Sequence, residues 1–556
     1  MRKPLPVLLS GGVDARAAHV ARAVEEAGIE PGSGTRVAMV TLGCDKNTVD
    51  SERILSSLLG AGVELADSPG DADVVVVNTC GFIEMAKQES IDTLLEVARL
   101  KEEGTVRAVV GMGCLVQRYK PELVAEMPEV DVFLGLTEID RLVPELAERG
   151  IISADTPLTA RPLRVLSSAN GPRHSAHLKI SEGCDHGCAF CAIPLMRGKF
   201  RSTPVGVLLA EAQELERRGV VELNVVSQDT TWYGRDWARA LARGEDAPVW
   251  SEDGGSWFLG RTFEGMPNAD RSSGPLPAAP VAGELVPPGG GRGGGATDER
   301  RRGAFTARGV EGPVRPGPLS LEGVTRTGAL PLLLTSLLAE TGIPWIRLFY
   351  MYPSGITEEL VRLLGRHDRI LPYLDMPIQH GADTVLQRMR RPERRATIVE
   401  RVRWLREAVP GIALRTTVIV GFPGETEEEF DALLELLEEV RFDHVGAFAY
   451  SEEEGTGAAA MPDRVPGTVR RERLERLLEL QRGIALEKNA QRVGTRVTVL
   501  IDEVVDHTAV ARAPWQAPEV DGTVEIEEAS ALAPGTFVEV EITGAGEFDL
   551  TARVAS

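Results

Sequence analysis

The chain has 556 residues, of which 43% are hydrophobic and 26% charged, and its formal net charge is −22. This length exceeds what one compact core usually contains, so we expect two to four domains, and the composition excludes a collagen, a wholly disordered chain and a membrane protein. The sequence has no run of about 18 apolar residues, and the apolar run that follows Met1 is too short for a signal peptide, so we expect a cytoplasmic protein without membrane contact.

Residues 1–35 resemble a short extension, and residues 36–165 form a first domain in which strand and helix patterns alternate. Strand-like runs at 36–41, 73–77 and 106–110 are each followed by a helical pattern. This alternation predicts a parallel α/β sheet, in which ligands bind beyond the carboxyl ends of the strands. Each run ends close to a cysteine, and these three cysteines are Cys44, Cys80 and Cys114.

A second alternating series occupies residues 174–234 and 330–485. Its six strand-like runs predict a partial barrel of the eightfold β/α type: 177–181, 222–226, 345–350, 373–376, 414–420 and 444–449. Such barrels carry their active site where the strands end, and polar motifs follow several of these strands. From those motifs we select four candidate cofactor-binding residues, two of them glycines that permit close backbone approach to a ligand: Gln228, Gln379, Gly421 and Gly424.

Two further segments differ in composition from this α/β pattern. Residues 235–329 are an expected insertion between the second and third barrel strands, because residues 251–300 contain 12 glycines and 6 prolines, a proportion typical of disorder. A charged helical segment leads to residues 491–556, where short alternating strands and Gly/Pro turns predict a small antiparallel β-barrel.

The strongest chemical motif is Cys184-Asp-His-Gly-Cys188-Ala-Phe-Cys191, with three cysteines in eight residues directly after a strand. The chain has only six cysteines, so in a reducing cytosol they are better explained as metal ligands or catalysts than as a disulfide framework. A cubane iron–sulfur cluster normally binds four thiolates, one per iron, so three thiolates leave one iron open. Zinc, with His186 as a fourth ligand, is the alternative metal.

This motif resembles the CxxxCxxC motif of the radical S-adenosylmethionine superfamily, with Phe190 at the aromatic position before the last cysteine. The resemblance implies that S-adenosylmethionine binds the open iron, next to Phe190. One electron from the reduced cluster then cleaves the cofactor to a 5′-deoxyadenosyl radical, which abstracts hydrogen from an unactivated C–H bond. No acid or base removes such a proton near pH 7. The electron would come from a donor such as flavodoxin or ferredoxin.

With its three N-terminal cysteines included, the chain resembles the methylthiotransferase family. The matching motifs are TLGCDKN at 41–47, NTCGFI at 78–83 and GCLVQRY at 113–119. The resemblance implies two 4Fe–4S clusters, the second held by Cys44, Cys80 and Cys114, and a TRAM-like domain at residues 491–556. It also implies that the second cluster holds the sulfur that is inserted, that one S-adenosylmethionine methylates this sulfur, and that another activates the acceptor carbon.

Two branches of this family differ in their acceptor. The stretches 42–47, 227–231 and 376–383 resemble the branch that modifies the β-carbon of an aspartate in the twelfth small-subunit ribosomal protein. Residues 491–556 contain 4 arginines and 12 carboxylates, which suit a basic ribosomal protein better than RNA. The alternatives are methylthiolation of an adenosine in transfer RNA and, from another class, a non-catalytic iron–sulfur binding protein. The sequence identifies no catalytic acid or base and no sulfur source.

Overall fold

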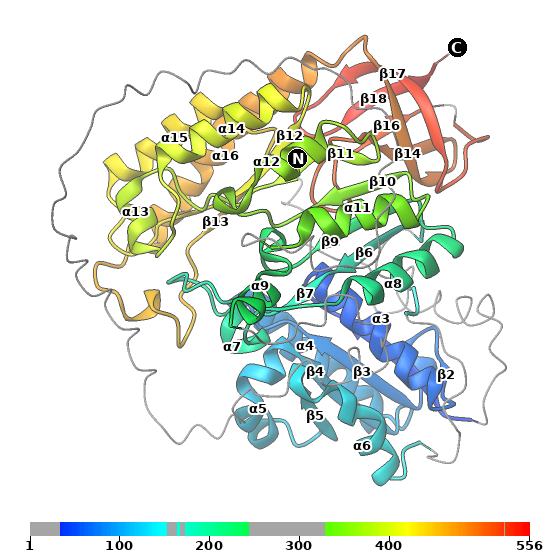
Figure 1. The fold of residues 1–556 in the computed structure, drawn as a ribbon. Helices are drawn as coiled ribbons and strands as arrows, with labels where there is room; N and C mark the ends of the chain where they lie inside the picture. The colour runs from blue at the N-terminus through cyan, green and yellow to red at the C-terminus, as the bar shows by residue number, and fades with distance from the viewer. Residues whose placement is uncertain (1–33, 153–163, 167–172, 244–327, 528, 556) are drawn as a thin grey trace. The chain divides into compact units, whose positions relative to one another are not determined.

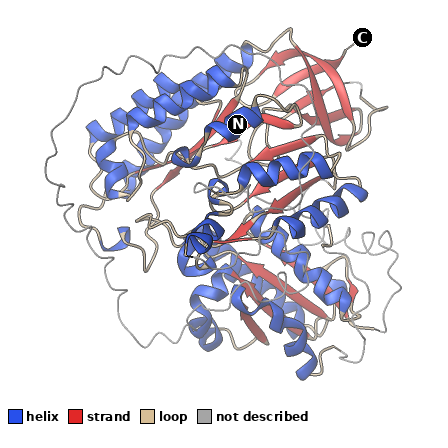
Figure 2. Ribbon diagram, viewed as in Figure 1, coloured by secondary structure: helices blue, strands red, loops and turns tan. Residues whose placement is uncertain are grey.

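The structure, a computed structural model, describes residues 34–152, 164–166, 173–243, 328–527 and 529–555 (Figure 1). The N-terminal extension and most of the expected insertion lie outside these residues. The described residues form a five-stranded sheet, a six-stranded sheet, a closed five-stranded barrel and a short hairpin, whose strands are red in Figure 2. Within this part of the chain, no helix is long and apolar enough to cross a membrane.

The N-terminal sheet is parallel throughout and has the strand order β2-β1-β3-β4-β5, which confirms the predicted α/β class. Its strands are β1 (Arg36–Thr41), β2 (Glu64–Leu65), β3 (Val74–Thr79), β4 (Ala108–Gly113) and β5 (Val132–Gly135). Its helices are α3 (Asp45–Gly60), α4 (Glu84–Glu102), α5 (Cys114–Glu126) and α6 (Leu142–Glu148). Alternate residues of β3 separate two apolar layers, because Val75 and Val77 pack with α4 and α5, whereas Val74 and Val76 pack with α3 and α6.

The central sheet is also parallel, and its order β6-β9-β10-β11-β12-β13 follows the chain. Its strands are β6 (Ser175–Lys179), β9 (Glu222–Val226), β10 (Trp345–Leu348), β11 (Ile370–Asp375), β12 (Ala413–Val420) and β13 (His444–Ala449). The helices of this part are α7 (Ile193–Arg197), α8 (Val205–Arg217), α9 (Arg235–Ala242), α11 (Leu330–Glu340), α12 (Glu358–Leu364), α13 (Asp383–Arg388), α14 (Arg395–Ala408), α15 (Glu427–Val440) and α16 (Gly467–Ala490). Because β6 and β13 remain edges of the described sheet, the barrel is partial, as predicted.

The segment between β9 and β10 starts with a helix that the sequence did not predict. Residues 235–242 form α9, with Trp237 buried, so the prediction that the insertion begins at 235 is wrong for these residues. The predicted insertion therefore begins too early, because the composition rich in glycine and proline starts only after this helix. Residues 244–327 lie outside the described part of the chain.

The two described ends of this segment meet at one point. The Ala329 amide donates a hydrogen bond to the Tyr233 carbonyl at 2.6 Å. Gly234 lies against the same residue, since a Cβ on Gly234 would be 2.4 Å from the Ala329 Cβ. We refer to this contact of Tyr233 and Gly234 with Ala329 as the neck. It holds the two ends of the segment together at the central sheet, whatever lies between them.

The C-terminal barrel closes in the order β14-β15-β16-β18-β17. Its strands are β14 (Arg496–Val505), β15 (Thr508–Arg512), β16 (Val524–Ile526), β17 (Phe537–Ala545) and β18 (Leu550–Val554). The predicted antiparallel barrel is confirmed with one difference, because β16 and β18 pair in parallel. Apolar residues of this barrel, including Leu500 and Ala517, pack with Trp345 and Tyr373 of the central sheet, and the Trp345 and Phe537 ring centroids are 5.1 Å apart.

A buried carboxylate at the start of β9 joins the C-terminal barrel to the central sheet. Glu222 is fully buried and accepts hydrogen bonds from Arg347 at 3.0 Å and from Arg512 at 2.6 Å, and Arg512 also pairs with Asp502. Burial opposes ionisation of Glu222, but the charges of Arg512 and Arg347 outweigh it and lower its pKa to about 2. The ionised group therefore stabilises the docked barrel.

We expect Glu222→Gln to lower the free energy of unfolding by about 3–5 kcal/mol, because it leaves the buried Arg347 without its carboxylate and the buried Arg512 with Asp502 alone. Urea denaturation at pH 7 measures this. The stabilisation is present above the pKa of about 4.3 of an unfolded glutamate and is lost as the pH falls towards about 2. The difference between the variant and the wild type should therefore shrink over that range, and a constant difference would contradict the assignment.

Replacing residues 244–327 by about six Gly and Ser residues should leave the melting temperature within about 3 °C of the wild type, because the neck at Tyr233 and Ala329 is retained. Differential scanning calorimetry measures the change. The matched control deletes residues 234–329. This deletion also removes Gly234 and Ala329, and with them the neck, so the variant should lose cooperative unfolding. Equal loss in both variants would show that the segment is part of the folded core.

Candidate functional site

The three cysteines of the CxxxCxxC motif share one loop between β7 (Ser181–Glu182) and α7. This loop is closed by the pairing of β7 with β8 (Arg201–Ser202) and by a hydrogen bond from the Cys184 amide to the Gly198 carbonyl at 2.9 Å. Gly183 is required here, because its φ is +74° and a Cβ would come within 2.1 Å of the Lys199 carbonyl oxygen.

The thiols of this loop interact with one another. Burial and the charge of Cys188 together raise the pKa of Cys191 to about 12. The pKa of Cys184 is raised by burial and by the charges of Cys191 and Cys188. Three sulfurs that share a partly buried loop and repel one another as thiolates are suited to a cationic partner, and iron supplies that charge. The residues therefore fit an iron–sulfur cluster.

His186 does not complete a zinc site, so the zinc alternative is not supported. Its ring is stacked between those of Trp232 and Tyr352, with centroid distances of 3.8 and 4.0 Å, and its Nε2 lies 2.6 Å from Asp229 Oδ2. Among the described residues, no three His, Cys, Asp or Glu side chains are arranged to hold a single ion. A cubane differs in this respect, because each thiolate binds a different iron and the sulfurs stand further apart.

Two side chains from distant parts of the sequence lie beside Cys188. The Tyr352 hydroxyl is 3.7 Å from its sulfur and Arg391 Nη1 is 3.9 Å away. Arg391 is buried over the Tyr352 ring, at 4.0 Å from the centroid, and pairs with Glu393 at 3.1 Å. Such groups around a ligating sulfur tune a cluster. No sequence signal points to Arg391, because it belongs to no motif and approaches Cys188 only in the fold.

The three N-terminal cysteines also come together at the carboxyl ends of β1, β3 and β4. Two glycines allow the loops to approach. A Cβ on Gly43 would be 2.8 Å from the Cys80 Cβ, and one on Gly81 would be 2.8 Å from the Cα of Leu115, the residue after Cys114. We refer to Cys44, Cys80 and Cys114 as the N-terminal triad.

Burial and mutual repulsion dominate the chemistry of this triad. Burial raises the pKa of Cys80 to about 11 and that of Cys114 to about 12, and the charge of Cys44 adds to both shifts. The charge of Arg197 acts in the opposite direction and lowers the pKa of both thiols. The arrangement resembles that of the CxxxCxxC loop, since three sulfurs converge in each.

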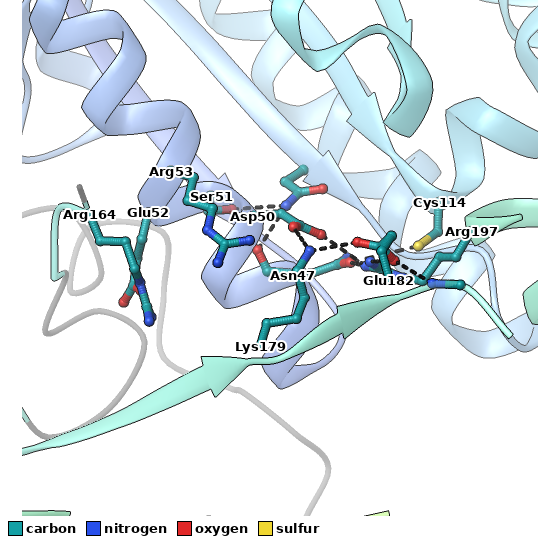
Figure 3. A network of polar contacts seen from close by, with 12 residues as sticks. Asn47, Asp50, Ser51, Glu52, Arg53, Cys114, Arg164, Lys179, Glu182 and Arg197 are labelled. Carbon is teal, nitrogen blue, oxygen red and sulfur yellow. Dashed lines mark hydrogen bonds and ion pairs between the residues drawn. The ribbon is translucent and has the colours of Figure 1, made fainter. Parts of the chain in front are cut away.

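A buried polar network connects the two groups of cysteines (Figure 3). Arg197, at the end of α7, donates hydrogen bonds to Asn47 Oδ1 at 2.7 Å and Asp50 Oδ2 at 3.1 Å in α3. It also bonds to Glu182 at 2.8 Å, and Lys179 pairs with Asp50 and Glu182. Because α7 follows Cys191 and α3 follows Cys44, this network joins the two cysteine-bearing segments.

Apolar contacts reinforce the same junction. Cys114 packs in one cluster with Ala192 and Met196, the first of which directly follows Cys191. In addition, the Tyr350 hydroxyl lies 3.2 Å from Asp45 Oδ1, and Lys46 Nζ lies 3.0 Å from the centroid of the Tyr350 ring. The start of α3, directly after Cys44, therefore also touches Tyr350, just beyond the end of β10.

The other predicted cofactor-binding residues lie at the carboxyl ends of the central strands or in the cysteine loop. Phe190 packs against an apolar cluster that includes Phe422 and Tyr450. Gln228 is half-buried directly after β9. Gln379 has a φ of +71° and continues the sheet by pairing with Val418. Their positions agree with the expected end of the barrel, and their contact with a cofactor remains a prediction.

The two glycines after β12 have neighbours within the chain. Gly421 has a φ of +72°, and a Cβ there would be 2.1 Å from the Arg470 Cγ. The expected room for a ligand is therefore filled by Arg470, and packing of α16 explains this glycine. Gly424 has a φ of +74° and its amide donates to the Asp463 carbonyl at 2.8 Å, as expected for a turn.

In the metal-free protein, we expect iodoacetamide to modify Cys44 before Cys80, Cys114 and Cys191 at pH 8. Cys44 is exposed, whereas the raised pKa values keep the other three protonated and unreactive until the pH approaches about 11 or 12. Mass spectrometry of the alkylated peptides measures the order. Denatured protein is the control and should react evenly, and native Cys80 reacting as fast as Cys44 at pH 8 would contradict the burial.

Three family models match this chain. The uncharacterized protein family UPF0004 matches residues 36–135, the Radical SAM superfamily matches residues 323–437, and the TRAM domain matches residues 493–555. These ranges fall in the N-terminal sheet, the central sheet and the C-terminal barrel.

Curated relatives match almost the whole chain. It is 40% identical over 530 residues to the ribosomal protein uS12 methylthiotransferase RimO of Anaeromyxobacter sp. (strain Fw109-5), covering 94% of this chain and 93% of the relative. It is 38% identical over 527 residues to the protein of that name from Desulforudis audaxviator (strain MP104C), covering 94% and 97%. A solved structure of the radical S-adenosylmethionine methyltransferase TsrM from Kitasatospora setae, with cobalamin and a 4Fe–4S cluster bound, is 13% identical with a TM-score of 0.44 and covers 86% of this chain and 80% of that chain. On the identity and coverage of its curated relatives, the chain belongs to the RimO family of radical S-adenosylmethionine methylthiotransferases.

Proposed function

We propose that this enzyme transfers a methylthio group to the β-carbon of an aspartate in ribosomal protein uS12. One observation carries the proposal: the chain folds two separate cysteine triads, from motifs more than 60 residues apart, into segments joined by Arg197 and Asn47. Its curated relatives are named for the same reaction. A reaction that needs both a radical source and a sulfur source requires two such sites close together.

The two cysteine triads suit two 4Fe–4S clusters with different functions. Cys184, Cys188 and Cys191 would hold the cluster that binds S-adenosylmethionine, and the N-terminal triad would hold the second. The cofactor supplies a radical able to abstract hydrogen from an unactivated C–H bond and a methyl group for the inserted sulfur. The protein buries Cys80, Cys114 and Cys184 and places Tyr352 and Arg391 beside Cys188, where Arg391 supplies positive charge.

Charge favours a basic protein over transfer RNA as the acceptor. Arg512 of the C-terminal barrel is buried against Glu222, Arg553 pairs with Glu541, and Arg492 lies over the Trp515 ring at 3.8 Å from its centroid. Two arginines of the barrel are exposed, Arg496 and Arg553, against eight exposed carboxylates among the described residues: Glu503, Asp506, Glu519, Glu525, Glu527, Glu539, Glu547 and Asp549. Phosphate backbones are repelled by such a surface, whereas a lysine- and arginine-rich ribosomal protein is attracted.

The reaction also defines partners of a stated kind. Reduction of the first cluster needs a low-potential one-electron donor, such as a flavodoxin or a ferredoxin. Modification of a ribosomal protein takes place in the cytoplasm, where uS12 is made and assembled. No membrane partner is needed for this chemistry.

Reconstituted enzyme with S-adenosylmethionine and a reductant should add one SCH2 unit to uS12, which intact-protein and peptide mass spectrometry would locate on an aspartate. Cys188→Ala is expected to abolish both this gain and the formation of 5′-deoxyadenosine. Cys114→Ala should retain 5′-deoxyadenosine formation and lose the sulfur gain, because only the second site is removed.

The alternatives give different results in the same assay. Modification of transfer RNA with uS12 unchanged would replace the proposed acceptor. Absence of 5′-deoxyadenosine in reduced, fully loaded protein would instead favour a non-catalytic iron–sulfur protein.

A further inference from the structure

Asn47 touches all three loops of the N-terminal triad. Its Nδ2 donates to the Leu42 carbonyl at 2.8 Å and to the Thr79 carbonyl at 3.1 Å, in the loops that carry Cys44 and Cys80. Its Oδ1 lies 3.6 Å from the Cys114 sulfur. The amide is fully buried, so its orientation sets how the three loops are held together.

Arg197 fixes that amide from the other cysteine motif. Its Nη2 donates to Asn47 Oδ1 at 2.7 Å, and its side chain is fully buried between α7 and α3. Asp50 and Glu182 hold the remaining face of the guanidinium at 3.1 and 2.8 Å. Because the Arg197 guanidinium is held by these two carboxylates and donates to Asn47 Oδ1, the Asn47 amide has a single orientation, with its NH2 group towards the two carbonyls.

Arg197 also places a cation next to the triad. Its Nη2 and the Cys114 sulfur approach the same atom, Asn47 Oδ1, at 2.7 and 3.6 Å. Its counterions, Asp50 and Glu182, are shared with Lys179, which pairs with both. The network is therefore balanced in charge, and the guanidinium is the charged member that bonds to the amide beside Cys114.

We propose that Arg197 is a positioning residue for the N-terminal triad: it holds Asn47 across the three cysteine loops and stabilises the negative charge of a cluster bound there. The inference rests on the function proposed above, in which this triad holds a 4Fe–4S cluster. Reduction adds one negative charge to a cluster, so a nearby buried cation raises its reduction potential. Loss of Arg197 should therefore make the second cluster harder to reduce.

Arg164 offers a matched control in the same junction. It is 1% exposed and binds Glu52 and Glu211, so it too is a buried arginine held by two carboxylates. Figure 3 shows it on the side of the network away from Cys114. Each site also keeps a second cation after substitution, Lys179 in one case and Arg53 in the other. A purely structural role would be common to both arginines.

The test uses the full chain with Cys184, Cys188 and Cys191 changed to Ala, so that iron is bound by the N-terminal triad alone. Into this parent we introduce Arg197→Met, Arg197→Lys or Arg164→Met. Iron and sulfide analysis, thermal melting and a dithionite titration followed by electron paramagnetic resonance give loading, stability and midpoint potential. We expect both Met variants to melt at lower temperature, but only Arg197→Met to shift the potential to more negative values.

Arg197→Lys should fall between the parent and Arg197→Met, because it keeps the charge and loses the fork that binds Glu182 through Nη1 and both Asn47 and Asp50 through Nη2. If Arg197→Met loads no iron while Arg164→Met loads fully, the positioning role is supported, and Arg197→Lys should then recover part of the loading. Equal potentials in all variants, or an equal shift in Arg164→Met, would overturn the inference. A parent without iron would instead contradict the second cluster, and with it the proposed function.

Discussion

The structure depends on one buried junction, in which Arg197 and Lys179 are paired with Asp50 and Glu182. Burying these four charges is costly unless each is satisfied, so the contact persists only in one geometry. That geometry has a chemical consequence, because Arg197 lies six residues after Cys191 and binds the helix that begins directly after Cys44. The two cysteine-bearing segments are therefore held by the same set of hydrogen bonds, and neither can move without breaking buried ion pairs.

The two ends of the central strands have different tasks. Glu222, at the amino end of β9, binds Arg512 and so attaches the C-terminal barrel. The carboxyl ends lead to the cysteine loop and the polar residues around Asp229, which orients His186. This division explains why an acidic barrel can be part of an enzyme whose reactive groups are anionic sulfurs. Its buried contacts with the sheet include the Glu222–Arg512 ion pair, the Tyr373–Asp521 hydrogen bond and the apolar packing of Leu500 and Ala517, and its exposed carboxylates remain available for a basic partner.

Local patterns predicted the repeating parts of this fold, whereas contacts between distant residues were not predictable. Apolar runs ending at polar motifs identified all six central strands, and CxxxCxxC identified the first site, because both signals are contained in short windows. The burial of Asn47 and Asp50 was not predictable, because it depends on Arg197, 150 residues away from Asn47. The zinc alternative with His186 as fourth ligand stayed open in the sequence, because the motif says nothing of Trp232 and Tyr352, which enclose its ring.

The most direct test of this account is the iron and acid-labile sulfide content of anaerobically loaded protein, combined with Mössbauer spectroscopy. Two separate cubanes require about eight irons per chain, and replacing the cysteines of either triad by alanine should remove about four and leave the other spectrum intact. About four irons in the wild type, lost completely when either triad is replaced, would show one cluster shared by all six sulfurs. The two-site arrangement held by Arg197 would then be wrong.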